Sequence, residues 1–306
     1  MKHLRPLLLL LFTCLGGLAL FVARSDANPE TIRLIAPGVW FREGDMDQGH
    51  CNNIIIEMKD YLIVVDANFP SGARGAMADA KRLSSKPVKY VFDTHHHGDH
   101  LYGNPVWTQA GATTLAFAAV GQELKRLEPA RWKSTEKTRP DVAELKRDGP
   151  EAPKQDIDEP LFVLNDGSRK VEFRHFGWAH TRGDGFVYLP KEQVLCTGDA
   201  VVNGPYNATM DANIGNWPAV LRSAGKLKIK HVLPGHGLPA GGELIDGQAQ
   251  FMTELHKAVK AGIDQGKKLE ELQADVKLPA AVETWVGANS LKGQVKDAYD
   301  EITKGK

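Results

Sequence analysis

The segment FDTHHHGDHLYGN, residues 92–104, concentrates side chains that bind metal ions. Four of the chain's 11 histidines and two aspartates fall within residues 93–100. Neutral imidazoles and carboxylates are ligands that suit zinc and similar first-row ions. An exposed polar loop would not explain why the cluster directly follows an apolar run. The segment therefore predicts a metal site, whose ligands follow the pattern H-x-H-x-D-H: His95, His97, Asp99 and His100.

Spacing divides this cluster into two pairs. Alternate side chains of an extended segment face the same side, so His95 and His97 are expected to converge while His96 turns away. Gly98 allows a sharp bend, after which the following Asp-His pair reaches a second point. We therefore expect His96 to lie beside the site or at the surface, and to be the histidine whose mutation matters least.

Three later positions offer the ligands that a two-metal site still needs. His180 in AHTRGD, Asp199 in TGDA and His236 in PGHG each follow a predicted strand. A glycine close to each lets the backbone turn sharply toward a site. Gly-Asp alone is an ordinary turn sequence, but the shared position at strand ends predicts that all three meet the histidine cluster.

The elements that must hold these residues alternate between strands and helices. Apolar residues at helical spacing predict helices over 72–85, 217–227 and 243–266. β-branched and apolar runs predict strands over 39–41, 53–58, 61–67, 88–93, 161–164, 170–176, 185–189, 193–196 and 231–233. This order fits an α/β fold in which sheets pack together and helices lie outside.

A charged segment interrupts the pattern at 121–160, where Lys, Arg, Glu, Asp and Pro replace most large apolar residues. We interpret it as an exposed insertion with helical pieces, which either covers the site or is simply solvated. The tail, 243–306, is expected to be mostly helical. No linker rich in Pro, Gly or Ser divides residues 28–306, so we expect them to form one domain.

The N-terminus has the order of a secretory signal peptide. Lys2 and Arg5 precede an apolar run over 7–23, and the small residues Ser25 and Ala27 follow it. We expect cleavage after Ala27 and an exported protein, periplasmic or secreted, with no stable membrane insertion afterwards. The apolar run is slightly short for a spanning helix of about 20 residues; an uncleaved anchor is the alternative.

Composition narrows the class of protein. A hydrophobic content of 42% and a charged content of 25% are typical of globular proteins, and zero net charge gives no basic excess for nucleic acid. Cys51 and Cys196 are far apart and in no C-x-x-C pair, so we expect two small, partly buried side chains rather than a disulfide framework. The expected partner is a small-molecule substrate, and the oligomeric state stays open.

In their order, THHHGDH, AHTRGD, TGDA and PGHG resemble the metallo-β-lactamase-fold hydrolase superfamily, over nearly all of the chain after Ala27. The resemblance implies a four-layer αβ/βα sandwich with two divalent metal ions at its edge, zinc in preference to iron or manganese. It implies hydrolysis by a metal-bridging hydroxide, with Asp99 as the catalytic acid and base. It assigns His95, His97 and His180 to one ion, Asp99, His100 and His236 to the other, and Asp199 to both.

Asp199 also indicates a branch of the superfamily. Members that hydrolyse β-lactams generally have Cys or Ser at this position, whereas the aspartate resembles glyoxalase II, lactonases and other broad hydrolases. We therefore expect a dinuclear hydrolase of an ester, thioester, lactone or amide. The alternatives are a β-lactam hydrolase, an iron-dependent persulfide dioxygenase, and a binding protein that keeps the ligands without catalysis. The complete second ligand set argues against the one-iron dioxygenase.

Residues around the motifs have further predicted roles. Asp93 and Thr94 are expected to orient the histidine segment by local hydrogen bonds, and Asp184 to hydrogen-bond a ligand histidine. We interpret His175, inside a predicted strand, as a packed histidine. We expect His50 to lie near the mouth of the site and Tyr206 and Asn207 to line the pocket. We expect Trp217 to lie in the core rather than in the pocket.

Overall fold

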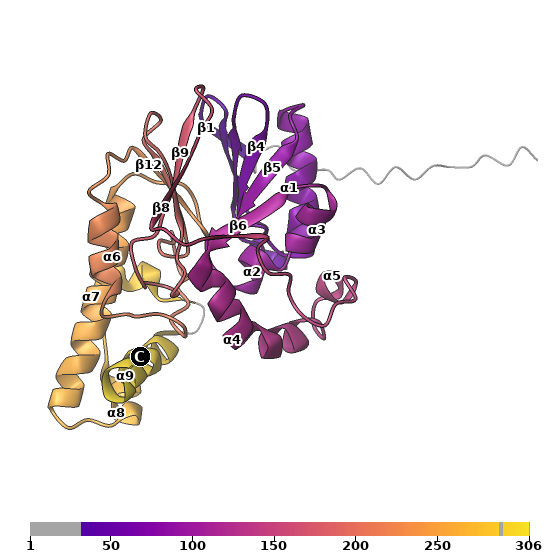
Figure 1. Cartoon of the computed structure of the whole chain (residues 1–306). Helices are drawn as coiled ribbons and strands as arrows, with labels where there is room; N and C mark the ends of the chain where they lie inside the picture. Colours follow the sequence, from indigo (N-terminus) through magenta and orange to yellow (C-terminus); the bar gives the residue numbers. More distant parts are fainter. Residues whose placement is uncertain (1–31, 288–289, 306) are drawn as a thin grey trace, which may run out of the picture.

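The computed structural model describes residues 32–287 and 290–305. Two β-sheets lie face to face between two groups of helices, which is the expected four-layer sandwich (Figure 1). The predicted signal peptide, 1–27, lies outside the described residues. No helix in the described ranges is long and apolar enough to cross a bilayer.

The first sheet has seven strands in chain order, antiparallel from β1 to β4 and parallel from β4 to β7. They are β1 (Ile32–Ala36), β2 (Val39–Arg42), β3 (Asn53–Glu57), β4 (Leu62–Val65), β5 (Val88–Phe92), β6 (Thr113–Phe117) and β7 (Gln155–Ile157).

The second sheet has five strands, and only β11 and β12 run parallel to each other. In spatial order they are β12 (His231–Pro234), β11 (Val194–Gly198), β10 (Phe186–Leu189), β9 (Lys170–Arg174) and β8 (Leu161–Asn165).

Strand β3 shows why the central strands are apolar without alternation. Ile54 and Ile56 pack into the core between the two sheets, whereas Ile55 packs against the helices outside. Because both faces are covered, the three central side chains of this strand are all apolar, and polar residues occur only at its ends. The helices on this outer face are α1 (Pro70–Leu83) and α3 (Asn104–Gln109) (Figure 1).

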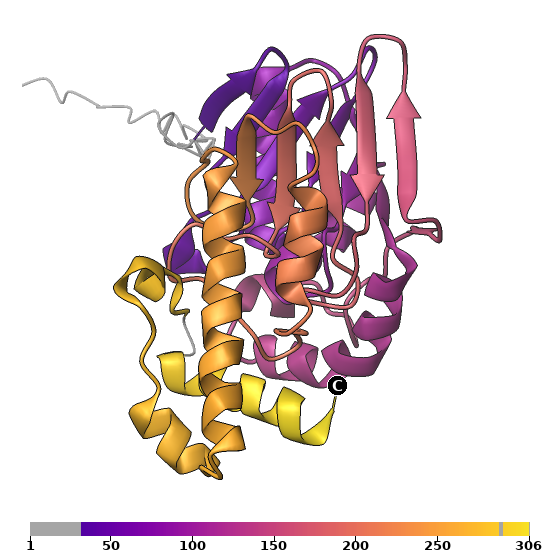
Figure 2. The same ribbon diagram turned by 90° about the vertical axis from the view of Figure 1, so that its left-hand side faces the viewer.

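The other outer layer covers the second sheet. Figure 2 shows α6 (Trp217–Ala224) and the long α7 (Glu243–Asp264) lying along it. Trp217 is fully buried in this layer, as expected for a core residue. The helical tail continues as α8 (Leu269–Asp275), the 3₁₀ helix η3 (Ala280–Trp285) and α9 (Ser290–Lys304).

The charged segment is mostly exposed, as expected, but part of it packs against the rest of the protein. It forms α4 (Ala118–Thr135) and α5 (Pro140–Ala143), and its end pairs with β6 as strand β7. Trp132 and Val142 are buried in a small core with Tyr102. The segment therefore has the expected helical pieces and a largely exposed surface, while a few large apolar residues pack one face of its charged helix against the rest of the protein.

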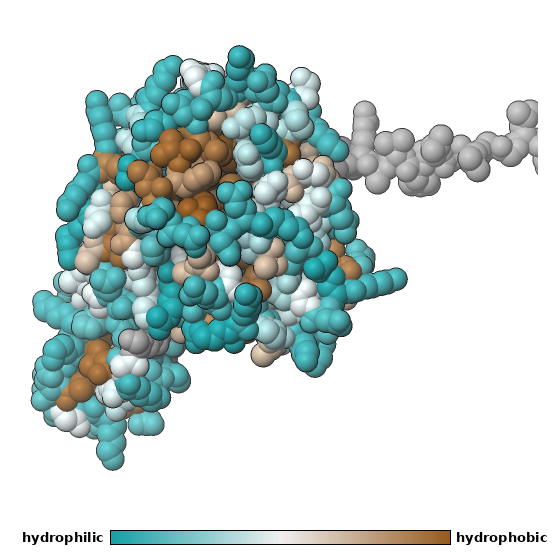
Figure 3. Space-filling view, in the orientation of Figure 1, coloured by the Kyte–Doolittle hydropathy of each residue, from teal (hydrophilic) through white to brown (hydrophobic). Residues whose placement is uncertain are grey.

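Strand β8 forms one edge of the second sheet. Leu161 and Val163 on it are exposed, and Figure 3 shows an apolar area over β8 and β9 on this face of the molecule. Neither residue lines the pocket described below, so this edge is separate from the candidate site.

Candidate metal centre

The structure brings all seven predicted ligands to one place. His95 and His97 follow β5, while His180 lies between β9 and β10, Asp199 follows β11 and His236 follows β12. Asp99 and His100 lie on a single helical turn, α2 (Gly98–Leu101), where the sequence had predicted a loop with a bend. A Cβ at Gly98 would lie 2.8 Å from the Tyr102 ring, so this glycine allows close packing rather than a bend.

The first set of donors consists of three imidazoles. The candidate ligand nitrogens of His95, His97 and His180 lie within 4.8 Å of one another. His97 Nδ1 is 3.0 Å from His180 Nε2, and His95 Nε2 is buried without a hydrogen bond from the described residues. Burial and the neighbouring histidines hold the pKa of His95 well below its usual range and lower that of His180 to about 3. Both rings are therefore neutral and have lone pairs for a metal ion.

The second set combines carboxylate and imidazole. Asp99 Oδ2 lies 3.0 Å from His236 Nε2 and 3.4 Å from His100 Nε2. Burial opposes charge here, but the two histidines outweigh it and hold the pKa of Asp99 well below its usual range. Asp99 is therefore an ionised oxygen donor at neutral pH.

Asp199 lies between the two sets. Its Oδ1 is 3.4 Å from His100 Nε2, and its Oδ2 is 3.6 Å from His236 Nε2 and 3.9 Å from His180 Nε2. Gly235 allows this approach, because a Cβ there would lie 2.1 Å from Asp199 Oδ1. One carboxylate thus faces both donor sets.

The other ring nitrogen of each histidine has a polar partner, an arrangement that fixes the orientation of metal-binding imidazoles. The partner atoms are Thr94 Oγ1 for His95 (3.0 Å), Asp211 Oδ2 for His97 (2.8 Å), Asp66 Oδ2 for His100 (2.9 Å), the Ala208 carbonyl for His180 (2.9 Å) and Met46 Sδ for His236 (3.3 Å). Anchored rings, inward-facing nitrogens that gather in two sets and a shared carboxylate fit two divalent ions.

Asp66 was not among the predicted functional residues. It follows β4 with φ +67°, a backbone region that non-glycine residues seldom adopt. Its carboxylate accepts hydrogen bonds from the Thr94 N–H (2.8 Å) and from His100 Nδ1. The available signal was its place directly after an apolar strand, which the predicted ligands share.

Asp211 was also missed, and it joins the site to α4. Arg131 on α4 donates two hydrogen bonds to the Asp211 carboxylate, at 2.7 and 2.9 Å, and a third at 3.0 Å to Glu128. Although burial opposes it, hydrogen bonds from His96, His97 and Arg131 hold the pKa of Asp211 well below its usual range. Nothing in the local sequence TMDAN marks this aspartate.

His96 points away from the first donor set, as its spacing predicted, but it is not at the surface. It is fully buried, and its Nε2 lies 3.3 Å from Asp211 Oδ2 and 3.4 Å from a guanidinium nitrogen of Arg131. His96, His97 and Asp211 are close enough together to suggest another cation site. The Arg131 guanidinium already supplies the positive charge at this point.

Asp184 does hydrogen-bond a predicted ligand histidine, but it does so through the backbone of His180 and not through the ring. Its carboxylate also accepts the Thr181 N–H at 2.9 Å and so braces the loop that carries His180. Two other weaker assignments were wrong. His50 is buried against Ser71 Oγ, 2.8 Å away. The Asn207 side chain turns to the Trp285 carbonyl, also at 2.8 Å.

Two of the surrounding predictions agree with the structure. Thr94 holds the His95 ring, and Asp93 accepts a hydrogen bond from Asn104 at 2.8 Å. His175 packs against Phe117 and bonds the Asp184 carbonyl, and it belongs to neither donor set.

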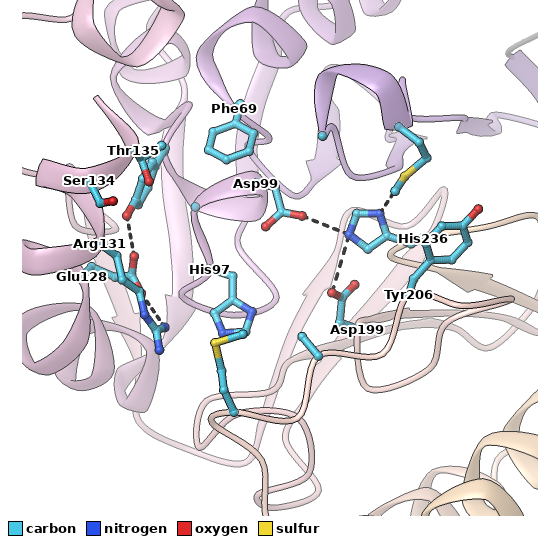
Figure 4. A pocket seen from close by; sticks show the side chains of 16 residues that line it. Phe69, His97, Asp99, Glu128, Arg131, Ser134, Thr135, Asp199, Tyr206 and His236 are labelled. Carbon is cyan, nitrogen blue, oxygen red and sulfur yellow. Dashed lines mark hydrogen bonds and ion pairs between the residues drawn. The ribbon is translucent and has the colours of Figure 1, made fainter. Parts of the chain in front are cut away.

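A pocket of about 530 Å³ opens onto the donors (Figure 4). Tyr206 lines it, as predicted. Helix α4 forms one wall, so the charged segment does cover the site. Its contributions are Glu128, Arg131, Ser134 and Thr135.

Comparison with known proteins agrees with this geometry. The family model described as the metallo-beta-lactamase superfamily matches residues 46–236, which include all seven predicted ligands. A metallo-beta-lactamase type 2 from Bacillus cereus is 26% identical over 195 residues, which are 61% of this chain and 66% of that protein. The match thus spans slightly less than two thirds of that relative.

Solved structures share the fold at low identity. A metallo-beta-lactamase from Pontibacter korlensis aligns with a TM-score of 0.60 and 19% identity, over 72% of this chain and 98% of that one. A stereoselective inverting sec-alkylsulfatase from Pseudomonas sp. aligns with a TM-score of 0.70 and 19% identity, over 89% of this chain and 50% of that one. Because the family model covers more than half of the sequence, this chain belongs to the metallo-beta-lactamase superfamily.

Proposed function

We propose that this protein is a dinuclear metallohydrolase that cleaves a small ester, thioester, lactone or amide. The observation that carries the proposal is the pair of donor sets that meet at Asp199. His95, His97 and His180 would hold one ion, and Asp99, His100 and His236 the other. Nitrogen and carboxylate donors favour zinc, with iron or manganese as alternatives. Two such ions supply a Lewis acid for the carbonyl and lower the pKa of water toward neutrality.

Asp99 is the residue we propose for proton transfer. Its side chain is 24% exposed and lines the pocket, so it can contact both water and substrate. His236 and His100 hold its carboxylate in place from the other side. An ionised carboxylate in this position can orient a water molecule, accept its proton and pass a proton to the leaving group.

The proposal is tested by metal analysis of the purified protein, run beside a substrate panel. The panel comprises a lactone, a thioester, a chromogenic cephalosporin and, because a sulfatase shares the fold, an alkyl sulfate. We expect about two zinc ions per chain and turnover of a carbonyl substrate that chelator abolishes. Asp99→Asn should lose most activity and weaken binding of the ion assigned to Asp99, His100 and His236, while the ion assigned to the three histidines stays bound. One iron per chain together with oxygen consumption would instead support a persulfide dioxygenase. Faster hydrolysis of the cephalosporin than of the other substrates would support a β-lactamase.

We also propose that the protein acts after export, in the periplasm or outside the cell, on a small-molecule substrate. The support is the charged, apolar and small-residue order of residues 1–27. Cell fractionation and intact mass of the native protein test this. A chain found in the exported fraction and beginning near residue 28 is the expected result, whereas a full-length chain in the cytoplasm would contradict it.

A further inference from the structure

Beyond the predicted metal ligands, the pocket has largely apolar walls. Figure 4 shows Phe69 and Tyr206 on either side of Asp99. Phe69 packs edge-on against Tyr102, and Tyr206 packs against His236, with ring centroids 5.8 Å apart in both pairs. The partly exposed thioethers Met46 and Met210 complete this surface, which offers an apolar group burial away from water.

The charged wall of the same pocket does not offer a free cation. Arg131 is the one lysine or arginine among the described residues that line it. Its guanidinium is already bonded to two carboxylates, Asp211 by two hydrogen bonds and Glu128 by one. Glu128 is 1% exposed. Two carboxylates around one guanidinium leave this wall with excess negative charge.

The cation that stacks on the pocket residue Phe69 is also engaged. Arg139 stacks on the Phe69 ring, 3.6 Å from the ring centroid, and pairs with Asp141 at 3.2 Å. It does not line the pocket. A substrate carboxylate seated beyond the metal ligands would therefore lose water and approach Glu128 without gaining a free positive partner.

We propose that the pocket selects substrates whose acyl part is uncharged, with an alkyl or aryl group against Phe69, Tyr206 and the two methionines. Substrates with a carboxylate or sulfate on the acyl part are disfavoured. This inference rests on the proposed hydrolase function and narrows its substrate class to esters, thioesters, lactones or amides of uncharged acids.

A matched pair of esters tests the inference on the zinc-loaded full chain. The pair is 4-nitrophenyl hexanoate and the mono-4-nitrophenyl ester of adipic acid, which has a carboxylate in place of the terminal methyl group. We expect kcat/KM to be at least about tenfold higher for the uncharged ester, since like charges close together are strongly disfavoured. The difference should shrink at high salt. Equal or higher kcat/KM for the charged ester would overturn the inference.

Two variants test the cause of the preference. Met210→Lys adds a cation to the pocket wall and should raise kcat/KM for the charged ester relative to the uncharged one. Glu128→Gln removes a negative charge beside Arg131 and should act in the same direction. Leu34→Lys is the matched control, because Leu34 is 65% exposed on β1 and does not line the pocket. If the ratio of kcat/KM for the charged ester to kcat/KM for the uncharged ester shifted equally in all three variants, the proposed role of this pocket wall would be contradicted.

Binding of methyl ketones separates this inference from the proposed function. 2-Heptanone and 6-oxoheptanoate carry the same two acyl groups but have no bond to hydrolyse. Ligand-observed NMR should show tighter binding of 2-heptanone, whether or not the esters are cleaved. Ester cleavage with equal or tighter binding of 6-oxoheptanoate would refute only the selectivity. Tighter 2-heptanone binding without any ester cleavage would refute only the hydrolase function.

Discussion

Asp211 accepts a hydrogen bond from His97 at 2.8 Å, on the ring nitrogen opposite the one that faces His180. The same carboxylate also accepts two hydrogen bonds from Arg131, which lies on α4. A helix that forms a wall of the pocket is thereby connected to a predicted metal ligand through two side chains. The orientation of His97 thus depends on residues far from it in the sequence.

Loss of the Asp211 charge should weaken binding of one metal ion more than the other. Asp211→Asn removes the carboxylate that anchors His97 and leaves Arg131 and His96 without it. Residues that hydrogen-bond a metal-binding histidine in this way contribute about 10–100-fold to metal affinity. We expect a loss of this size for the ion held by His97, measured by competition with a chromophoric chelator, and a much smaller loss for the other ion.

The control for this variant is Asp264→Asn, which removes an exposed carboxylate that pairs with Lys260 on α7. It should leave both affinities unchanged. A second comparison uses two arginines of α4: Arg131→Met should weaken the same ion, whereas Arg126→Met, which breaks only the pair with Glu123, should not. Equal weakening of both ions in Asp211→Asn would show a general structural defect instead.

His96 should matter for stability and not for the number of metal ions. Because the ring is fully buried beside Asp211, His96→Ala leaves a cavity and should lower the free energy of unfolding by about 2 kcal/mol or more. His231→Ala, at the start of β12, changes a partly exposed histidine and should cost no more than about 0.5 kcal/mol. Denaturant unfolding measures both. A fall to one ion per chain in His96→Ala would instead make His96 a ligand.

Metal removal should lower the melting temperature. The donor sets bring buried carboxylates and imidazoles together, so an ion that binds only the folded chain stabilises it. At a free zinc concentration of 100 Kd, the gain is about 2.7 kcal/mol per ion, which corresponds to several degrees. Asp199→Ala should lose most of this gain, because Asp199 faces both sets. Calorimetry with chelator and with added zinc gives the comparison; an unchanged melting temperature would argue against tight binding.

The sequence predicted the alternation of strands and helices, and the seven residues that meet at the candidate site, because those features are local; the four-layer sandwich was predicted from the family resemblance. A buried strand is continuously apolar, and a ligand follows directly after its strand, so both can be recognised within a few residues. Trp217 in the core follows from the same local pattern. Strands β1 and β6 were missed because IRLIA and TTLAF are short and mixed in character.

The partners around the donors could not be predicted because they depend on contacts distant in sequence. Asp211 is 114 residues from His97 and 80 from Arg131. The direction of the His96 side chain was predicted correctly from the alternation of residues. Its burial depends on contacts with Glu128 and Arg131 of α4, which are distant in sequence. Asp184 was expected to hydrogen-bond a ligand histidine, and it does so through the His180 backbone within the same short loop, where it also accepts the Thr181 N–H.

Thiol labelling tests the burial of the cysteines and the proposed removal of the signal peptide together. Cys51 and Cys196 are free and fully buried rather than partly buried, and burial raises the pKa of both thiols, to about 12 for Cys51. Neither should react with iodoacetamide in the native protein at pH 8, because reaction needs an accessible thiolate.

After denaturation without reductant, a chain that begins near residue 28 should show two reactive thiols. The full chain should show three, since Cys14 lies in the predicted signal peptide. Rapid labelling of the native protein would contradict the buried positions, and thiols that appear only after reduction would show a disulfide that the structure does not contain.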